Sequence, residues 1–382
     1  MQYIPFGNTG KQVSRLGFGA MRLPTTENEH GEPVIHRQEA IAMMRRAIDG
    51  GVNYIDTAYG YHQGESEVVT GLALRGGYRE RVILTTKLPQ WLVKETGDMD
   101  RLLDEQLKRL GLNYVDFYLL HALNLEAFNR LKGLDYKGFI KRAQADGRIR
   151  HTGFSFHDNK AAFMEILDDY PWDLAQIQLN YLDDENQATL EGLTYAGKRG
   201  VPVVVMEPLR GGALATPPPE IKSLMGENHR GYSPVEWAFR YCGQYPEVAT
   251  ILSGMSTMAQ VEDNLRIFEG LTPGNLNAED LAFTKTLKEA YLSRLKVACT
   301  ACGYCQPCPE GVQIPEIFEV YNEAHMLNRP HTLGQRYERF LRAEADAARC
   351  VACGQCKEIC PQQLPIIRLL QDIHREAGAH VS

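Results

Sequence analysis

The sequence lacks the features that mark several classes of protein. No apolar run approaches the roughly 18 residues that a membrane-spanning helix needs, so we expect no membrane span. Basic residues are fewer than acidic ones, 41 against 48, and the net charge of −7 gives no reason to expect nucleic-acid binding. Residues 1–7 have the pattern of neither a secretory signal nor a transit peptide. We therefore expect a cytoplasmic protein.

What the sequence does contain is a large apolar fraction and an unusual arrangement of cysteines. Apolar residues make up 44% of the 382 residues, enough for a large core, and the length suits two domains. Of the nine cysteines, Cys242 stands alone in an apolar stretch and is expected to be a small buried apolar group. The others lie in two tight groups near the C-terminus: Cys299, Cys302, Cys305 and Cys308, then Cys350, Cys353, Cys356 and Cys360.

The spacing within these two groups resembles that of a ferredoxin that binds two 4Fe–4S clusters. The second group matches the C-x2-C-x2-C-x3-C-P run in full, whereas only Gln306 and Pro307 separate the last pair of the first group. In such proteins the first three thiolates of a run hold one cluster and the fourth ligates the other. The resemblance implies one ligand set of Cys299, Cys302, Cys305 and Cys360, and a second set of Cys350, Cys353, Cys356 and Cys308.

Two other roles for these cysteines are less favoured. Structural zinc usually takes paired C-x2-C units rather than four cysteines in a row. Disulfides need an oxidising compartment, and the sequence shows no secretory signal. Thiolates are soft ligands that suit iron–sulfur clusters. The cysteines therefore predict two [4Fe-4S] clusters.

Before residue 280 the chain alternates between short apolar runs and segments with helical spacing. The helical segment 36–50 ends at a pair of glycines and the segment 100–110 ends at Gly111, because glycine accepts the left-handed backbone that often follows a helix. Strands separated by helices in this way argue for a parallel sheet. The predicted strands are Leu16–Met21, Asn53–Ala58, Val82–Leu88, Val115–His121, Ile149–Phe156, Leu174–Asn180, Val201–Met206 and Val248–Gly254.

Eight such units in about 280 residues predict a (β/α)8 TIM barrel. A doubly wound open sheet is the alternative, and it would be favoured by a glycine-rich phosphate-binding turn after the first strand. Residues 17–22 do not supply that turn. The predicted fold is therefore a barrel domain, residues 1–280, followed by a small ferredoxin-like iron–sulfur domain, residues 281–382.

Smaller elements are expected around these two domains. Residues 3–14 are predicted to form a hairpin ahead of the barrel. The proline-rich stretch 215–219 is predicted to be a rigid loop after the seventh strand, and 277–297 a helix that leads to the cysteines. A polar helical segment is expected over 337–347, between the two cysteine groups.

Four reactive side chains fall at the carboxyl ends of neighbouring strands, where TIM barrels place their chemistry. Asp56 and Tyr61 follow the second strand, Lys87 ends the third and His121 ends the fourth. Each also has a structural interpretation on its own, since an aspartate after a strand often bonds the next turn. Tyr59 competes with Tyr61 for the same role. The coincidence of the four on adjacent strands favours a shared catalytic function.

This constellation resembles that of the aldo-keto reductase family, whose tetrad has the same four residue types in the same order. The resemblance covers roughly residues 1–275, and with the cysteine-rich tail the chain resembles the ferredoxin-fused branch of the family. It implies an oxidoreductase that transfers hydride between a nicotinamide coenzyme and a small carbonyl or alcohol substrate. Tyr61 would give the proton, Lys87 would lower its pKa from about 10, Asp56 would hold Lys87, and His121 would orient the carbonyl.

The resemblance also implies a coenzyme site. Ser155 and Gln176 would contact the carboxamide, and Met206 takes the stacking position that is often aromatic, followed by Pro208 and Leu209. A thioether can pack on a ring, with less defined geometry than an aromatic. The adenosine-phosphate segment would contribute Gly254, Gln260, Asp263 and Asn264.

The coenzyme itself stays open between NADPH and NADH. Gly254 and Gln260 stand where the family often has basic residues, and a 2′-phosphate normally binds arginine or lysine. A helix start at the end of the last strand would use the same residue types, so the segment also has an ordinary structural interpretation.

Three functions remain open. The first is a two-domain oxidoreductase, with hydride chemistry on the barrel and one-electron transfer on the clusters. Since hydride carries two electrons and no flavin signature is present, the clusters would take one electron each, a redox partner protein would intervene, or the two domains would not be redox-coupled. The second is an electron-transfer subunit that docks to a larger enzyme, with the barrel as scaffold. The third is a reductase whose clusters only stabilise the fold.

Overall fold

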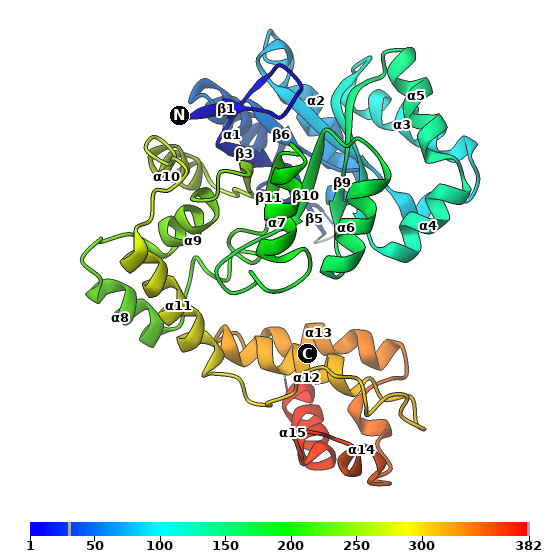
Figure 1. Ribbon diagram of the computed structural model, residues 1–382, viewed down its shortest axis with the longest axis vertical. Helices are drawn as coiled ribbons and strands as arrows, with labels where there is room; N and C mark the ends of the chain where they lie inside the picture. Colours follow the sequence, from blue (N-terminus) through cyan, green and yellow to red (C-terminus); the bar gives the residue numbers. More distant parts are fainter. Residues whose placement is uncertain (30–31, 380–382) are drawn as a thin grey trace. The chain divides into compact units, whose positions relative to one another are not determined.

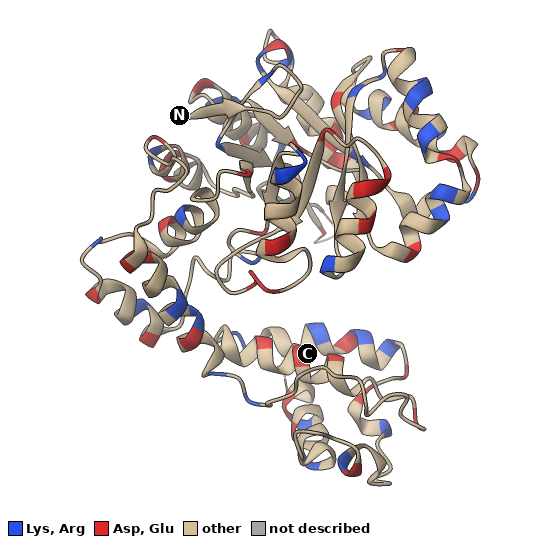
Figure 2. Ribbon diagram, in the orientation of Figure 1, with Lys and Arg blue, Asp and Glu red and all other residues tan. Residues whose placement is uncertain are grey.

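The computed structural model describes residues 1–29 and 32–379, and the chain divides into two compact units (Figure 1). The first comprises Met1–Gly211 and Val235–Leu281, and the second comprises Gly212–Pro234 and Ala282–Ser382. The helices of both units carry basic and acidic residues interspersed along their lengths (Figure 2). Within the described residues, no helix has both the length and the apolar character required to cross a membrane.

The first unit is a closed barrel of eight parallel strands, which confirms the barrel prediction over the open sheet. The strands are β3 (Leu16–Gly19), β6 (Tyr54–Asp56), β7 (Ile83–Leu88), β8 (Val115–Leu123), β9 (Ile149–Phe156), β10 (Leu174–Gln178), β11 (Val203–Met206) and β12 (Val248–Ser253). Their order around the barrel follows the chain, and β12 closes on β3 through the pairing of Ile251 with Leu16. Their carboxyl ends therefore meet at one mouth.

Helices cover the outside of this barrel (Figure 1). They are α1 (Arg37–Asp49), α2 (Glu65–Ala73), α3 (Gly97–Leu110), α4 (Leu125–Gly133), α5 (Tyr136–Ala145), α6 (Lys160–Asp169), α7 (Thr189–Lys198), α9 (Pro234–Gly243) and α10 (Met258–Ile267). In α3, Leu103, Leu107 and Leu110 lie on the buried face, as their spacing predicts. This helix ends at Gly111, whose φ of 65° is the left-handed conformation expected of a glycine cap.

Apolar side chains fill the barrel interior and close its amino-terminal end. The predicted hairpin is present as β1 (Tyr3–Pro5) and β2 (Gln12–Ser14), and a second hairpin is formed by β4 (Thr25–Glu27) and β5 (Pro33–Ile35). Phe6, at the tip of the first hairpin, is fully buried, with its ring 5.7 Å from Tyr54 and 5.0 Å from Phe117. Phe6 thereby closes the amino-terminal end of the barrel interior with apolar contacts.

The second unit is helical. Its helices are α8 (Pro219–Glu227), α11 (Ala278–Leu292), which begins in the first unit, α12 (Ile314–Met326), α13 (Thr332–Arg342), α14 (Gln355–Glu358) and α15 (Ile366–Gly378). Buried apolar side chains of α12, α13 and α15 form one core, against which six cysteines are packed, including Cys299 and Cys350. The helix expected over 337–347 begins earlier, at Thr332, because its apolar stripe starts at Leu333.

The segment Gly212–Pro234 lies in sequence within the range predicted for the barrel, yet it is part of the second unit. Arg329 Nη2 donates to Gly212 O at 3.1 Å and to Thr216 Oγ1 at 2.7 Å. Arg294 Nη1 forms an ion pair with Glu220 at 3.1 Å. Two arginines thus attach this long loop to the helical unit, which the sequence pattern did not indicate.

Candidate active site and cysteine clusters

A buried ion pair forms the centre of the barrel mouth. Asp56 is the last residue of β6, and Lys87 lies near the end of the neighbouring strand β7. Lys87 Nζ lies 2.6 Å from Asp56 Oδ1, 2.9 Å from Thr57 O and 3.2 Å from Tyr61 Oη. The Lys87 and Asp56 side chains are 1% and 2% exposed. The structure therefore brings three of the four predicted catalytic side chains into direct contact.

Charge is retained on this pair despite its burial. Burial alone would lower the pKa of Lys87, but Asp56 and Tyr61 raise it, and the net direction is upward. Burial also raises the pKa of Asp56, while the facing ammonium lowers it. Because an ammonium with a raised pKa is protonated at neutral pH, Lys87 presents a fixed positive charge to the phenol of Tyr61.

The Tyr61 phenol is held in its protonated form. Burial raises its pKa, the Lys87 ammonium lowers it, and the Asp56 carboxylate raises it again, so the net direction is upward. The sequence predicts the lowering by the lysine but not the burial that outweighs it. Since the phenol oxygen accepts a hydrogen bond from Lys87 Nζ, its own O–H is free to donate to a substrate.

His121 lies on β8 beside the phenol, with its ring centroid 6.1 Å from that of Tyr61 in an edge-on arrangement. Burial, together with the nearby Lys87 cation, lowers the pKa of His121 to about 3. Its buried Nδ1 has no hydrogen-bond partner among the residues that the structure describes. A neutral imidazole in this position can hydrogen-bond a carbonyl group without carrying a charge.

Several polar residues that hold the tetrad were not identified from the sequence. Thr57 Oγ1 lies 2.9 Å from Ser66 Oγ, which ties the end of β6 to α2. Glu67 is fully buried, and its Oε1 accepts from Thr86 Oγ1 and Gln106 Nε2, both at 2.6 Å. Ser66 and Glu67 follow Tyr61 closely in the sequence, in the run Gly64-Glu65-Ser66-Glu67, and this proximity is the signal that could have indicated their structural role.

The predicted carboxamide contacts lie on β9 and β10, and β9 pairs with β8, the strand that carries His121. Ser155 on β9 and Gln176 on β10 are register partners, and each is 1% exposed. Ser155 Oγ accepts from the backbone N–H of Ala122 at 2.8 Å, whereas Gln176 Oε1 has no partner among the described residues. An unpartnered buried oxygen fits a carboxamide N–H donor. Met206 ends β11, and Pro208 and Leu209 follow in the next turn.

The predicted adenosine segment follows β12 and includes the start of α10. Gln260 Oε1 accepts from Ser256 N at 2.7 Å, and Thr257 Oγ1 accepts from Gln260 N at 3.3 Å, an arrangement like a capping box. The Asp263 carboxylate is paired with Arg266 at 2.9 Å, on the helix surface. Asn264 Nδ2 donates to Ser253 Oγ at 2.8 Å and is buried. The side chains of Asp263 and Asn264 are therefore engaged within the protein.

Arg22 lies beside this segment, although it comes from the end of the first barrel strand. A Cβ built on Gly254 would lie 3.2 Å from Arg22 Cβ, and Ser256 Oγ donates to Arg22 O at 2.7 Å. The Arg22 side chain is exposed, and it has no carboxylate partner among the described residues. The sequence pattern did not indicate this cation because Arg22 and Gly254 are far apart in the chain.

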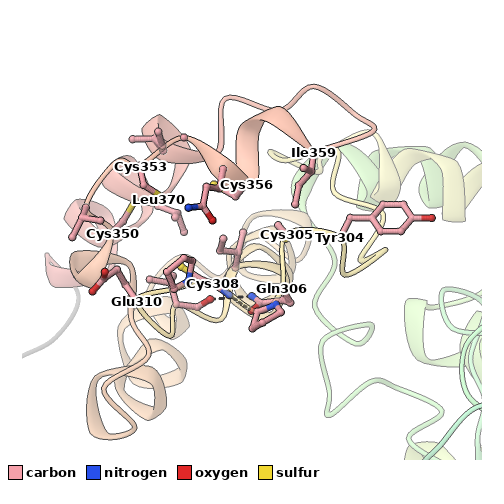
Figure 3. A pocket seen from close by; sticks show the side chains of 18 residues that line it. Tyr304, Cys305, Gln306, Cys308, Glu310, Cys350, Cys353, Cys356, Ile359 and Leu370 are labelled. Carbon is pink, nitrogen blue, oxygen red and sulfur yellow. Dashed lines mark hydrogen bonds between the residues drawn. The ribbon is translucent and has the colours of Figure 1, made fainter.

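Eight cysteines of the second unit line two hollows. Each hollow is lined by the four cysteines of one predicted ligand set. One hollow is lined by Cys299, Cys302, Cys305 and Cys360, and the other by Cys308, Cys350, Cys353 and Cys356, with Cys305 at its edge. Figure 3 shows the second hollow, with Cys308 on one loop, Cys350 and Cys353 on the facing loop and Cys356 in α14. Each hollow thus combines three cysteines of one motif with the last cysteine of the other.

The chemistry of these thiols suits an iron–sulfur cluster. Burial raises the pKa of Cys299, and the neighbouring Cys302 and Cys360 raise it further; burial raises the pKa of Cys305 to about 11. The raised pKa values of Cys299 and Cys305 favour their protonated thiols, so a positively charged centre is needed to hold these two side chains as thiolates. None of the nine cysteines, all in described residues, forms a disulfide, and Cys242 is fully buried as expected.

Within the described residues, no group of three or more His, Cys, Asp or Glu side chains is arranged to hold a single metal ion. A four-iron cluster is larger than one ion, so its ligands must surround a hollow rather than converge on a point. In both cysteine-lined hollows the cysteines surround the hollow, as such a cluster requires.

The closed barrel with its Asp–Tyr–Lys–His mouth, followed by a helical unit with two four-cysteine hollows, defines an oxidoreductase. The model of the aldo/keto reductase family matches residues 15–280, and the chain belongs to this family. The model of the 4Fe-4S dicluster domain matches residues 298–364. Both matches confirm the resemblances drawn from the sequence.

Similar proteins carry names that fit this assignment. The L-galactose dehydrogenase of Arabidopsis thaliana is 28% identical over 305 residues, which are 74% of this chain and 93% of that protein. The NADH-specific methylglyoxal reductase of Escherichia coli is 29% identical over 56% of this chain and 69% of its own length. The holo structure of aldo-keto reductase AKR11C1 from Bacillus halodurans matches with a TM-score of 0.63 and 27% identity, covering 75% of this chain and 96% of that one.

Proposed function

We propose that the barrel catalyses the nicotinamide-dependent reduction of a small carbonyl compound, or the reverse oxidation of an alcohol. The observation that carries this proposal is the contact of Lys87 Nζ with both Asp56 Oδ1 and Tyr61 Oη, at 2.6 and 3.2 Å. A scaffold protein would have no need of a buried ammonium that faces a phenol, because burying such a charge is costly.

The residues divide the reaction between them. A bound dihydronicotinamide supplies a hydride to the carbonyl carbon. As negative charge grows on the carbonyl oxygen, Tyr61 Oη gives that oxygen its proton, and the Lys87 ammonium stabilises the phenolate that remains. Asp56 keeps Lys87 charged and fixes its position. The neutral His121 ring, beside Tyr61, donates a ring N–H hydrogen bond that orients the carbonyl oxygen.

The coenzyme would be held on the side of the mouth formed by β9 to β12. Ser155 and Gln176 would contact its carboxamide, and the unpartnered Gln176 Oε1 favours this role. Met206 would pack on the nicotinamide ring, next to Pro208 and Leu209. The adenosine end would lie near Gly254, Gln260, Asp263 and Asn264.

Arg22 is the cation that we expect to meet the coenzyme phosphates, because it lies beside Gly254, where the predicted phosphate segment begins. Hydrogen bonds to charged groups contribute about 1.5–3 kcal/mol, so Arg22→Ala should raise the KM for the preferred coenzyme by about 10-fold to 100-fold. Comparison of NADPH with NADH locates the contact: a larger rise for NADPH indicates the 2′-phosphate. If Arg22→Ala leaves the KM for NADPH and the KM for NADH both unchanged, Arg22 does not contact the coenzyme.

The proton-donor role is tested with a matched pair of tyrosines on the same turn. We expect Tyr61→Phe to lower kcat by about 100-fold to 10,000-fold, the usual contribution of a general acid. Tyr59→Phe keeps the ring on which Arg109 lies and loses only the bond of its hydroxyl to Glu105 at 3.1 Å, so it should lower kcat far less than Tyr61→Phe does. Near-normal reduction of aldehydes by Tyr61→Phe would refute the mechanism.

For the second unit we propose that each cysteine-lined hollow holds one 4Fe–4S cluster, with the ligand sets given above. The supporting observation is that each hollow combines three cysteines of one motif with the fourth of the other. Anaerobically purified protein should contain about eight iron atoms per chain and absorb broadly near 400 nm. A colourless preparation without iron would contradict this part of the proposal.

Whether the clusters exchange electrons with the barrel is tested by adding NADH or NADPH without oxygen. If they do, the visible absorbance of the clusters should bleach, because reduction of the iron removes it. Bleaching that requires a second protein would indicate a redox partner protein. Intact carbonyl reduction without any bleaching would favour clusters that only stabilise the helical unit, against whose core the cysteines pack.

A further inference from the structure

The turn that carries Tyr61 has an unusual backbone. His62 and Gln63, directly after the tyrosine, have φ values of 49° and 57°, and Gly64 has a φ of 94°. Residues with a side chain avoid this left-handed region because Cβ approaches the following carbonyl oxygen. Two such residues in succession persist only where surrounding contacts hold them. The position of the phenol therefore depends on groups outside the turn.

Arg109, on α3, touches the turn at both of its ends. Its Nη1 donates to Tyr59 O at 3.1 Å, and its Cζ lies 4.0 Å from the centroid of the Tyr59 ring. At the other end, a Cβ built on Gly64 would lie 2.8 Å from Arg109 Nη1. The lack of a side chain at Gly64 is thus what lets the guanidinium reach across the turn.

Two carboxylates hold the guanidinium in this place. Arg109 Nη1 lies 3.4 Å from Oε2 of Glu67, which is fully buried, and Nη2 bonds Oε1 of Glu105. Glu105 also accepts from Tyr59 Oη at 3.1 Å, so the ring on which Arg109 stacks is itself fixed. Since α2, α3 and the turn each contribute one partner, the arrangement locks the turn onto the helical layer.

We propose that Arg109 is a positioning residue for carbonyl reduction, which acts by fixing residues 59–64 so that the Tyr61 phenol stays beside Lys87. The inference rests on the proposed role of Tyr61 as proton donor. It requires an arginine, because only a planar guanidinium can stack on a ring and donate in several directions at once. A lysine would keep the positive charge, but it would lose both the stacking on the Tyr59 ring and the forked set of N–H donors.

The test compares Arg109→Lys and Arg109→Ala with Arg101→Ala, a control on the same helix whose exposed side chain pairs with Asp98. We expect both Arg109 variants to lower kcat by about 100-fold, the effect of a small misplacement of a catalytic group, with the KM for the coenzyme nearly unchanged. Arg101→Ala should keep the wild-type kcat. Added guanidinium ion should restore part of the kcat of Arg109→Ala and none of that of Arg109→Lys.

A double variant separates positioning from a general structural effect. In the Tyr61→Phe background, Arg109→Lys should cause almost no further loss, because its effect passes through the absent hydroxyl. If the two losses multiply instead, Arg109 acts independently of Tyr61 and the inference is wrong. The proposed function is tested by a different result: full activity of the single variant Tyr61→Phe would contradict it. If Arg109→Ala does not fold, Arg109→Lys supplies every comparison except the rescue.

Discussion

Removing the negative charge of Asp56 should destabilise the barrel in a pH-dependent way. Asp56→Asn keeps the size of the side chain but leaves the Lys87 ammonium, 2.6 Å away and 1% exposed, without its counter-ion. Loss of one partner of a buried ion pair costs about 3–5 kcal/mol of the free energy of unfolding. The three tryptophans, Trp91, Trp172 and Trp237, all lie in the first unit, so their fluorescence in urea follows the barrel.

The sign of the pH dependence follows from Lys87. In the native protein Asp56 raises the pKa of Lys87, so the stability from the pair is fully present below 10.5 and is lost only as pH rises through the folded-state value. In Asp56→Asn the effect of burial prevails and lowers that pKa. The unfolded chain then binds a proton that the folded one lacks, and stability should rise with pH by up to about 1.4 kcal/mol per unit.

A second buried pair supplies the control. Asp116 Oδ2 lies 2.8 Å from Arg79 Nη2, with side chains 4% and 9% exposed, while its other partner, Lys11, is 37% exposed. Asp116→Asn should cost a similar free energy, but an arginine keeps its proton throughout the accessible range, so the stability should not climb with pH. A flat profile for Asp56→Asn between about pH 6 and pH 9 would refute the reasoning about Lys87.

Three further outcomes follow from the structure. Because burial and Lys87 lower the pKa of His121 to about 3, the pH profile of kcat/KM should contain no ionisation of His121 between about pH 5 and pH 8. An ionisation in this range that disappears in His121→Gln would contradict this. Cys353→Ser should reduce the iron content from about eight to about four atoms per chain, and an unchanged content would exclude Cys353 as a ligand. Phe6→Ala should cost the barrel about 3–5 kcal/mol, against less than about 0.5 kcal/mol for the exposed Met21→Ala; equal losses would show that Phe6 does not close the barrel.

The barrel could be predicted from the sequence because its strands are buried on both faces. A strand such as β11 is a run of apolar residues with no polar alternation, and the glycines and charges around it mark its limits. The start of α13 could not be located in this way, because its apolar stripe of Leu333, Tyr337 and Phe340 is sparse among polar residues. Nothing local in the stretch 212–234 indicated that it packs with the helical unit, since Arg329 and Arg294 attach it from far along the chain.

The position of the proposed catalytic residues could be predicted from the sequence for a different reason than that of the residues that support them. Asp56, Lys87 and His121 stand at strand ends, and the barrel topology alone brings strand ends together. Gln106 and Arg109 lie within a helix, and their function depends on which way α3 faces the turn after β6. Helical periodicity indicates that a face is buried, but it does not identify the loop that packs against it.

The electrostatics of the mouth also indicate that Lys87 matters more for stabilising negative charge than for its expected lowering of the Tyr61 pKa. Before reaction the Asp56 carboxylate and the Lys87 ammonium balance, and Tyr61 and His121 are both neutral. In the proposed reaction, the negative charge that would develop on the carbonyl oxygen then meets the Lys87 ammonium as a fixed cation in a buried site. Wherever the proton lies, on the product or on Tyr61, that charge lies close to the same fixed ammonium, at 3.2 Å when it is on the phenolate. The proposed catalysis would therefore depend on an ion pair that exists before the substrate arrives, and the phenol would contribute its proton within that field.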